Sequence, residues 1–278
     1  MPEQFDARLS IRAPQWTSGE VTTALTSPGT ATAAHGAAFA FPNAIARWTL
    51  PVRRWAWRQL DGENAKPNAD LVEPMLRRRL SPLARLALSA AAACGPLPEQ
   101  VRVVYASEHG EIQRTTQMLD ALVRGEPPSP TAFSLSVLNA TPGVLSIARH
   151  DHSAINAIAA GDDTLGYALL DAWTQLQDDD TRPVLVLYAF ESPPECYGPT
   201  AHAADASAHA FALLIDANAT ARLTCEMRRR ADDSARAFPQ PQSESLVHTL
   251  LGSGNARWRG ARHEWHWAWQ EEAPHASA

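Results

Sequence analysis

The chain has 278 residues, of which 45% are hydrophobic and 19% charged, so it can bury a sizeable core. The net charge is −6 and the arginines are mixed with acidic residues, which argues against a nucleic-acid binder or a membrane-surface protein. No apolar run is long enough to span a bilayer, and no signal peptide is apparent at the N-terminus. Three widely spaced cysteines fit a reducing cytoplasm, so we expect a cytoplasmic protein without a disulfide framework.

The first fifty residues carry little regular pattern. Alternation over Leu9–Ala13 predicts a short strand. Trp48, Trp55 and Trp57 then occur together with four arginines within residues 47–58. We interpret them as aromatic anchors under a loop, with the arginines stacked on their rings. The alternative is a functional patch that receives an acidic partner.

A helix is predicted after Ser81, which suits the N-cap, with Pro82 in the first helical position. Its apolar residues follow at helical spacing until Gly95-Pro96 ends the run. The β-branched run Val101–Tyr105 predicts a buried strand. The next amphipathic helix stops at Gly125.

The middle of the chain alternates further between helices and strands. We expect a short helix over Val144–Ala148 and a small-residue strand over Ile155–Ala160. The helix from Thr164 is the clearest in the chain, because its apolar residues recur at i, i+3, i+4, i+7, i+8 and i+11. The continuous apolar run Val184–Phe190 predicts a strand that is covered on both faces.

Further strands are expected at Phe211–Ile215 and Ala221–Met227, a short helix at Ser243–Leu251, and an edge strand at His263–Trp267. The alternation of strands with helices predicts an α/β fold, with a layered, mostly parallel sheet and helices on both faces. We expect residues 1–278 to form a single domain, in which residues 231–278 are a C-terminal extension that packs on the rest.

Four motifs in the middle of the chain occur in a distinctive order. They are Gly110-Glu111 before a helix, the Ser-Pro-x-x-Phe-Ser run at 129–134, Ser136–Asn139 followed by Gly143, and the strand-to-helix step at 155–164. Together they resemble the N-terminal half of a β-ketoacyl synthase. More closely, the chain resembles the ketosynthase-like proteins, called chain-length factors, of bacterial aryl polyene and xanthomonadin-type pigment clusters.

The resemblance implies the thiolase fold, in which a nucleophilic cysteine begins a buried helix of the first half and two histidines come from the second half. A helix N-terminus lowers a thiol's pKa and can hold an oxyanion. Counting from Asn139 without a gap places Asp162 at the position of that cysteine. Asp162 or Asp163 suits a helix cap but is a poor thioester-forming nucleophile. Too few residues follow Arg229 for a second half, so we expect a single half without catalytic residues.

The resemblance also implies partners. In the family, the strand before the nucleophile's helix pairs across a two-fold axis, so we expect a heterodimer with an active β-ketoacyl synthase, or a homodimer when the chain is alone. The expected interface and acyl-tunnel residues are Ala132, Phe133, Leu138, Asn139, Ile155, Ala157 and Ala159. Arg77, Arg78 and Arg79 are a candidate contact for an acidic acyl carrier protein. No cofactor, nucleic acid or membrane span is expected.

Other interpretations of the polar residues remain open. The His-Asp-His run at 150–152, with Asp162 and Asp163, could supply metal ligands, but an exposed turn explains it more simply. We therefore expect no metal site.

An enzyme is the second class of hypothesis, either an acyltransferase or a thioesterase. His109 beside Glu108 and Glu111 could be its base, but no Gly-x-Ser-x-Gly elbow supplies a nucleophile. The third hypothesis is a stand-alone protein that binds an acyl carrier protein or acyl-CoA and has no ketosynthase partner.

Overall fold

The computed structural model describes residues 44–60, 67–198, 207–230, 241–260 and 262–271. The chain divides into two compact units, residues 1–40 and 41–278, of which the first lies outside the described residues. The strand predicted at Leu9–Ala13 lies there too. Within the described part of the chain, no helix is long and apolar enough to cross a membrane.

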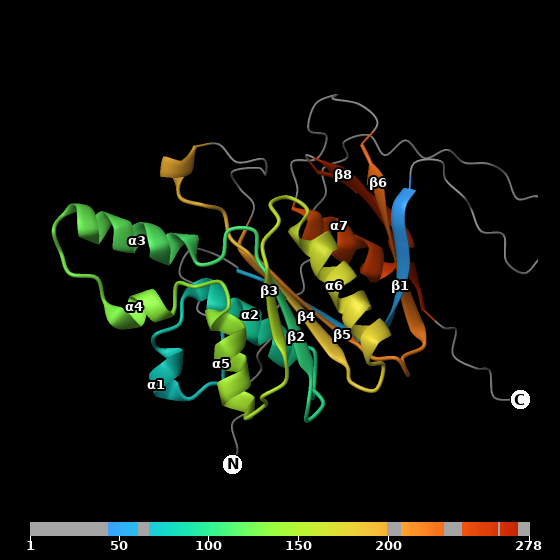
Figure 1. Ribbon diagram of the computed structural model, residues 1–278, viewed down its shortest axis with the longest axis horizontal. Helices are drawn as coiled ribbons and strands as arrows, with labels where there is room; N and C mark the ends of the chain where they lie inside the picture. Colours follow the sequence, from blue (N-terminus) through green and yellow to red (C-terminus); the bar gives the residue numbers. More distant parts are fainter. Residues whose placement is uncertain (1–43, 61–66, 199–206, 231–240, 261, 272–278) are drawn as a thin grey trace, which may run out of the picture. The chain divides into compact units, whose positions relative to one another are not determined.

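Helices and strands alternate through the middle of the second unit, as the sequence predicts (Figure 1). In chain order the elements are β1 (Ala44–Gln59), α1 (Pro74–Arg77), α2 (Pro82–Ala93), β2 (Arg102–Ala106), α3 (Ile112–Val123), α4 (Pro130–Ser134), α5 (Ala140–Arg149), β3 (Ile155–Ile158), α6 (Thr164–Asp178), β4 (Val184–Phe190), η1 (Glu195–Tyr197), β5 (His209–Ile215), β6 (Ala221–Arg229), α7 (Gln242–His248), η2 (Thr249–Ser253), β7 (Asn255–Arg259) and β8 (His263–Gln270).

The described strands form one sheet in the order β3-β2-β4-β5-β1-β6-β8-β7. β2 runs parallel to both β3 and β4, and the other five neighbouring pairs are antiparallel. The α/β fold class is confirmed, but the sheet is mixed, whereas we expected it to be mostly parallel. Parallel neighbours need long crossover connections, and helices supply these only between β2, β3 and β4. The β7–β8 connection, residues 260–262, is short enough for a hairpin.

Helices cover both faces of the sheet, as predicted. Val186 and Tyr188 of β4 belong to the core cluster that includes α6 and α7. Leu185 and Leu187, which point the other way, belong to the cluster that includes α2 and α5. The prediction that the strand at 184–190 is covered on both faces is therefore confirmed, because all of its side chains are buried.

The tryptophan and arginine window at 47–58 is a strand, β1, and the interpretation as a loop is wrong. Trp48 and Val52 are buried, and Trp55 and Trp57 pack partly against the same core cluster. The first half of β1 pairs with β6 and the second half with β5, and the pairing changes over at Val52. Pro51 obscured the pattern, because proline inside an apolar run argues against a central strand.

Two elements differ from their predicted bounds around the Asn-x-x-x-Gly motif. α5 starts at Ala140 rather than Val144, with Asn139 at its N-cap position, so Pro142 and Gly143 lie in its first turn. Proline is tolerated in the first turn, where its missing N–H has no helical partner. The strand expected at Ile155–Ala160 is shorter, and β3 ends at Ile158.

The C-terminal hairpin adds two strands to the sheet. β8 pairs with both β6 and β7, so it is not the edge strand that we expected; the edge is β7, which the sequence analysis missed. β7 escaped notice because it is short and polar, and Trp258 is its only buried residue. Through β8 the hairpin places Trp265 and Trp267 in the core.

Candidate functional site

The expected nucleophile position lies where β2, β3 and β4 end and α6 begins. Gly161, with φ of 60°, turns the chain after β3, and glycine adopts this left-handed conformation at little cost. Asp162 follows and is half-buried, and Asp163 occupies the N-cap position of α6 with an exposure of only 3%. The structure thus places both aspartates at the helix start, as the sequence predicts.

The Asp163 carboxylate does not cap α6, contrary to our expectation for this pair. Its Oδ1 accepts a hydrogen bond from Trp265 Nε1 at 2.7 Å, and its Oδ2 lies 3.0 Å from His263 Nδ1. The Gly166 amide in the first turn instead donates to the side-chain oxygen of Gln242, at 2.8 Å. The polar groups at the start of α6 are therefore already bonded to distant parts of the same chain.

The Trp265 ring lies directly against the first turn of α6. A β-carbon added at Gly166 would come within 2.5 Å of this ring, so only glycine fits there. A β-carbon at Gly260 would likewise come within 2.6 Å of Trp258 and 2.9 Å of Asp163 Oδ1. The hairpin of β7 and β8 is thus fixed to the helix start by hydrogen bonds and by close packing.

A buried polar chain that the sequence analysis missed lies beside this helix start. Ser243 Oγ lies 2.6 Å from His209 Nε2, and His209 Nδ1 lies 2.9 Å from the Ser207 carbonyl. Because a carbonyl only accepts, Nδ1 carries a proton; if the ring is neutral, Nε2 accepts from the Ser243 hydroxyl. The Tyr188 hydroxyl is hydrogen-bonded to Ser243, and burial raises the pKa of this tyrosine.

The polar chain is closed to solvent. His209 is stacked against Trp57 and Phe190, with ring centroids 4.5 and 5.0 Å apart. Both His209 and Ser243 have an exposure of 0%. In the described structure this serine and histidine therefore connect α7 to β4 and β5, and no substrate reaches them.

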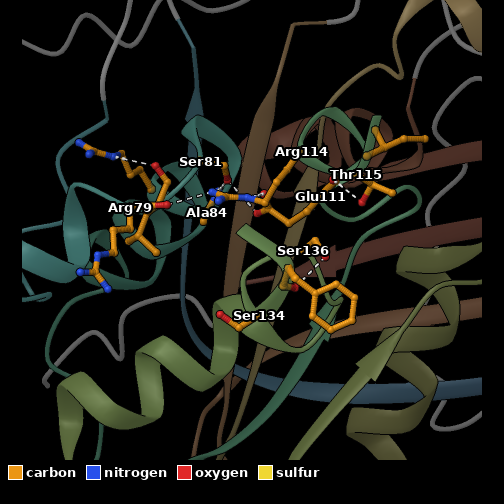
Figure 2. Close-up of polar contacts among 12 residues, drawn as sticks. Arg79, Ser81, Ala84, Glu111, Arg114, Thr115, Ser134 and Ser136 are labelled. Carbon is orange, nitrogen blue, oxygen red and sulfur yellow. Dashed lines mark hydrogen bonds and ion pairs between the residues drawn. The ribbon is translucent and has the colours of Figure 1, made fainter. Parts of the chain in front are cut away.

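Two acidic side chains lie near the ends of β2 and β4. Glu111 Oε1 accepts from Ser81 Oγ at 2.8 Å, and its Oε2 lies 3.4 Å from Arg114 Nε (Figure 2). Burial raises the pKa of Glu111, while the Ser81 and Arg114 contacts oppose that rise. Burial, and then the negative charge of Glu111, raise the pKa of Glu191 to about 8. Glu111 of this pair occupies the N-cap position of α3, a helix without buried residues.

The residues expected at the interface and tunnel lie on α4, on the approach to α5, on β3 and, for Ala159, directly after β3. Phe133 of α4 is 65% exposed, and its carbonyl accepts from Ser136 Oγ (Figure 2). Leu138 is half-buried and lies close to Gly110. Of the remaining expected residues, Asn139, Ala157 and Ala159 are exposed, while Ala132 and Ile155 are half-buried.

The three candidate carrier-contact arginines lie in and just after α1. Arg77 is bonded to Asp70, so it is not free for a partner. Arg78 and Arg79 are exposed, and the Arg79 carbonyl accepts from Arg114 Nη2 at 3.0 Å (Figure 2). This leaves Arg78 and Arg79 as the accessible members of the set.

The His-Asp-His run at 150–152 forms the turn between α5 and β3. His150 and His152 are exposed, whereas the buried Asp151 carboxylate accepts from the amides of Val101 and Ser153 at 3.0 Å. No group of three or more potential metal ligands lies close together among the described residues.

Among the described residues, His109, the candidate base of an acyltransferase, forms no hydrogen bond with a serine, threonine or cysteine side chain. Its Nε2 is buried without a hydrogen-bond partner in the described part of the chain and lies 3.6 Å from Glu108 Oε1. The buried polar residues that the sequence analysis missed at this site are His209, Ser243 and Gln242. Their partners are remote along the chain, so no local spacing could reveal them.

Comparison with known proteins agrees with this geometry. The family described as β-ketoacyl synthase, N-terminal domain, matches residues 52–268, and this span includes most of the segment that we expected to be an extension. No curated protein matches the sequence.

Several solved ketosynthase structures share the fold. A chain of the ketosynthase ApeO in complex with its chain length factor ApeC, from Xenorhabdus doucetiae, has a TM-score of 0.66 and 24% identity, covering 80% of this chain and 99% of that one. The ishigamide ketosynthase/chain length factor gives a TM-score of 0.51 at 17% identity, covering 73% of this chain and 72% of that one. A chain of the AntDE:AntF complex, a type II polyketide synthase acyl-carrier protein with its ketosynthase, gives 0.59 at 11%, with 81% and 99% covered. The fold is therefore thiolase-like, and the chain belongs to the β-ketoacyl synthase N-terminal domain family.

Proposed function

We propose that this protein is a non-catalytic, ketosynthase-like subunit, a chain-length factor, in type II fatty acid or polyketide biosynthesis, specifically of aryl polyene pigments. It pairs with an active β-ketoacyl synthase and shapes that enzyme's acyl tunnel. The observation that carries the proposal is the pair of aspartates at the start of α6, where the family resemblance expects a nucleophilic cysteine. The ketosynthase–chain length factor complexes of the same fold support it.

The chemistry of the helix start supports catalytic inactivity. A carboxylate is a poor nucleophile toward a thioester, and no cysteine occurs between Cys94 and Cys196. The Asp163 carboxylate is engaged by Trp265 and His263, so it serves to attach the hairpin. Three free cysteines agree with the reducing cytoplasm in which we place the protein.

The partner surface that we propose centres on β3. Among the described strands β3 has a single neighbour, β2, so the backbone groups of its other edge are available for pairing. Exposed apolar side chains also occur on the three helices that precede β3 in the chain: Leu119, Leu122 and Val123 of α3, Phe133 of α4 and Ile147 of α5. Large exposed apolar patches mark interaction surfaces in soluble proteins. We assign Ala132 and Phe133 to the side that reaches the partner's acyl tunnel.

A carrier-protein contact completes the proposal. Arg78 and Arg79 are the accessible cations beside α1, and we propose that they contact an acidic acyl carrier protein. Replacing both with glutamine should slow delivery of the acyl chain without affecting assembly with the ketosynthase.

Reconstitution tests the proposed role. A ketosynthase encoded in the same gene neighbourhood is assayed for chain elongation alone, with this protein, and with the variant Ala157→Arg, which places a charge on the exposed face of β3. The matched control is Gln177→Arg, an exposed position on α6. We expect elongation to need this protein, and Ala157→Arg but not Gln177→Arg to abolish the effect. Equal elongation by the ketosynthase alone would refute the proposal.

A stand-alone acyltransferase or thioesterase is the second candidate, favoured only by the 2.6 Å contact between Ser243 and His209. Mass spectrometry after incubation with acyl-CoA or acyl carrier protein separates the two. We expect no covalent adduct, because both residues are fully buried. An acyl group on Ser243 would establish the enzyme instead. If this protein binds acyl carrier protein but no ketosynthase, the third hypothesis, a stand-alone acyl-carrier-binding protein, would hold instead.

A further inference from the structure

A cavity of about 380 Å³ opens where β1, the C-terminal end of α2 and the C-terminal end of β8 meet. Its lining includes Arg53, Arg54 and Trp55 from the tryptophan and arginine window, which has no part in the proposed function. The cavity lies at Val52, which pairs with Ile215, the last residue of β5. Ile215 also pairs with Val184, the first residue of β4. The start of α6 follows the other end of the parallel strands, so the cavity is separate from that site. Its volume lies within the range of small-molecule sites, about 300–1,000 Å³.

Arg54 is held at this cavity but is not electrically neutralised. Its Nη2 donates to the Pro96 carbonyl, and a β-carbon at Gly95 would lie 3.1 Å from its Nη1. Gly95 has φ of 86°, so glycine both ends α2 and leaves room for the guanidinium. The buried Nε has no hydrogen-bond partner, and the guanidinium forms no ion pair, within the described residues. The neighbouring Arg53, in contrast, is paired with Asp216 at 2.5 Å.

Among the described residues, no group that lines the cavity forms an ion pair with Arg54. Burial raises the pKa of the Cys94 thiol, so this residue stays neutral beside Arg54. Glu271 also lines the cavity, but it forms no ion pair with Arg54. The guanidinium end of Arg54 carries more N–H donors than the one bonded to Pro96, so an anion that binds here gains the energy of a charge-assisted hydrogen bond.

The remaining walls suit a flat ring. Trp55 and Trp269 both line the cavity and are both only partly buried, so part of each indole is accessible. Indole faces stack with aromatic rings, and guanidinium groups prefer carboxylates and phosphates. We propose that this cavity binds a small organic anion, an aromatic ring that carries a carboxylate or a phosphate ester.

Isothermal titration calorimetry of the full chain tests the proposal. The probes are 2-naphthoate, 2-naphthyl phosphate and the neutral 2-naphthamide, and the variants are Arg54→Gln, Ala93→Phe and Arg58→Gln. Ala93 lines the cavity and is half-buried, so its replacement fills the space without removing a charge. Arg58 lies on the same strand but outside the cavity and donates to the Trp57 carbonyl, which makes it the matched control.

We expect at least one anionic probe to bind, with 2-naphthamide at least about tenfold weaker, as for the loss of one charge-assisted hydrogen bond. Arg54→Gln and Ala93→Phe should each weaken binding by about the same factor, and Arg58→Gln should leave it unchanged. Whether the carboxylate or the phosphate binds more tightly identifies the natural head group. Equal binding of the amide, an unaffected Arg54→Gln protein, or no binding at millimolar concentration would overturn the proposal. Ketosynthase association does not enter these measurements, so the two proposals fail independently.

Discussion

The buried carboxylate of Glu191 predicts an unusual dependence of stability on pH. Glu191 follows β4, accepts a hydrogen bond from the Gln113 amide, and lies near Glu111 and Arg114. Burial first, and the charge of Glu111 second, raise its pKa from 4.5 to about 8. The folded protein therefore retains a proton that the unfolded chain releases. By linkage, this contribution to stability is fully present below pH 4.5 and is lost as the pH rises toward 8.

The size of the effect follows from the shift in pKa. One pKa unit corresponds to about 1.4 kcal/mol, so a shift from 4.5 to about 8 sets an upper limit of about 5 kcal/mol. The side chain is only half-buried, and solvent screens part of the interaction, so we expect about 2 kcal/mol. Glu191→Gln removes the ionisable group but keeps an oxygen for the Gln113 amide.

Urea unfolding of the wild type and of Glu191→Gln, from pH 5 to pH 9, measures this contribution. We expect the variant to be more stable than the wild type by about 2 kcal/mol at pH 9, and the difference to shrink toward pH 5. Glu195→Gln, at an exposed position on η1, is the control and should follow the wild type. A difference between Glu191→Gln and the wild type that does not change with pH would refute the reasoning.

Two further substitutions test the packing of α6. Gly166→Ala should lower the melting temperature markedly, because the new methyl group would come within 2.5 Å of the Trp265 ring, whereas Gly143→Ala meets nothing within 4 Å and should be tolerated. Arg102→Met should cost about 2–3 kcal/mol in chemical unfolding, because the buried guanidinium donates to carbonyls at and just beyond the C-terminal end of α6, two of them at 2.6 and 2.7 Å. An unchanged melting temperature for Gly166→Ala, or an unchanged unfolding midpoint for Arg102→Met, would contradict the packing described.

The sequence predicted correctly those helices and strands whose apolar residues follow one clear period. The helix from Thr164 and the strand at 184–190 were placed correctly because their apolar spacing has one explanation. β1 was missed because Pro51 and several arginines interrupt an otherwise alternating run, and only pairing with β5 and β6 makes it a strand. β7 depends in the same way on its pairing with β8.

The candidate site was predictable in position but not in its contacts. The apolar periodicity from Thr164 predicted a helix start directly after Asp162 and Asp163, and the structure puts both aspartates there. The match of Asp162 to the nucleophile position is what the family resemblance implies. The capping role was wrong for Asp163, because its carboxylate is bonded to Trp265, 102 residues away, and Gln242 accepts from the Gly166 amide across 76 residues. Such contacts form because the sheet places the β7–β8 hairpin beside α6. The spacing of neighbouring residues in the sequence does not indicate this arrangement.

Native mass spectrometry of this protein co-expressed with the ketosynthase encoded beside it tests the proposed pairing. We expect a one-to-one complex that persists through size exclusion and is lost in Ala157→Arg, since we propose β3 as the pairing edge. Elution of this protein apart from the ketosynthase, as a monodisperse monomer with no affinity for it, would contradict the proposed role.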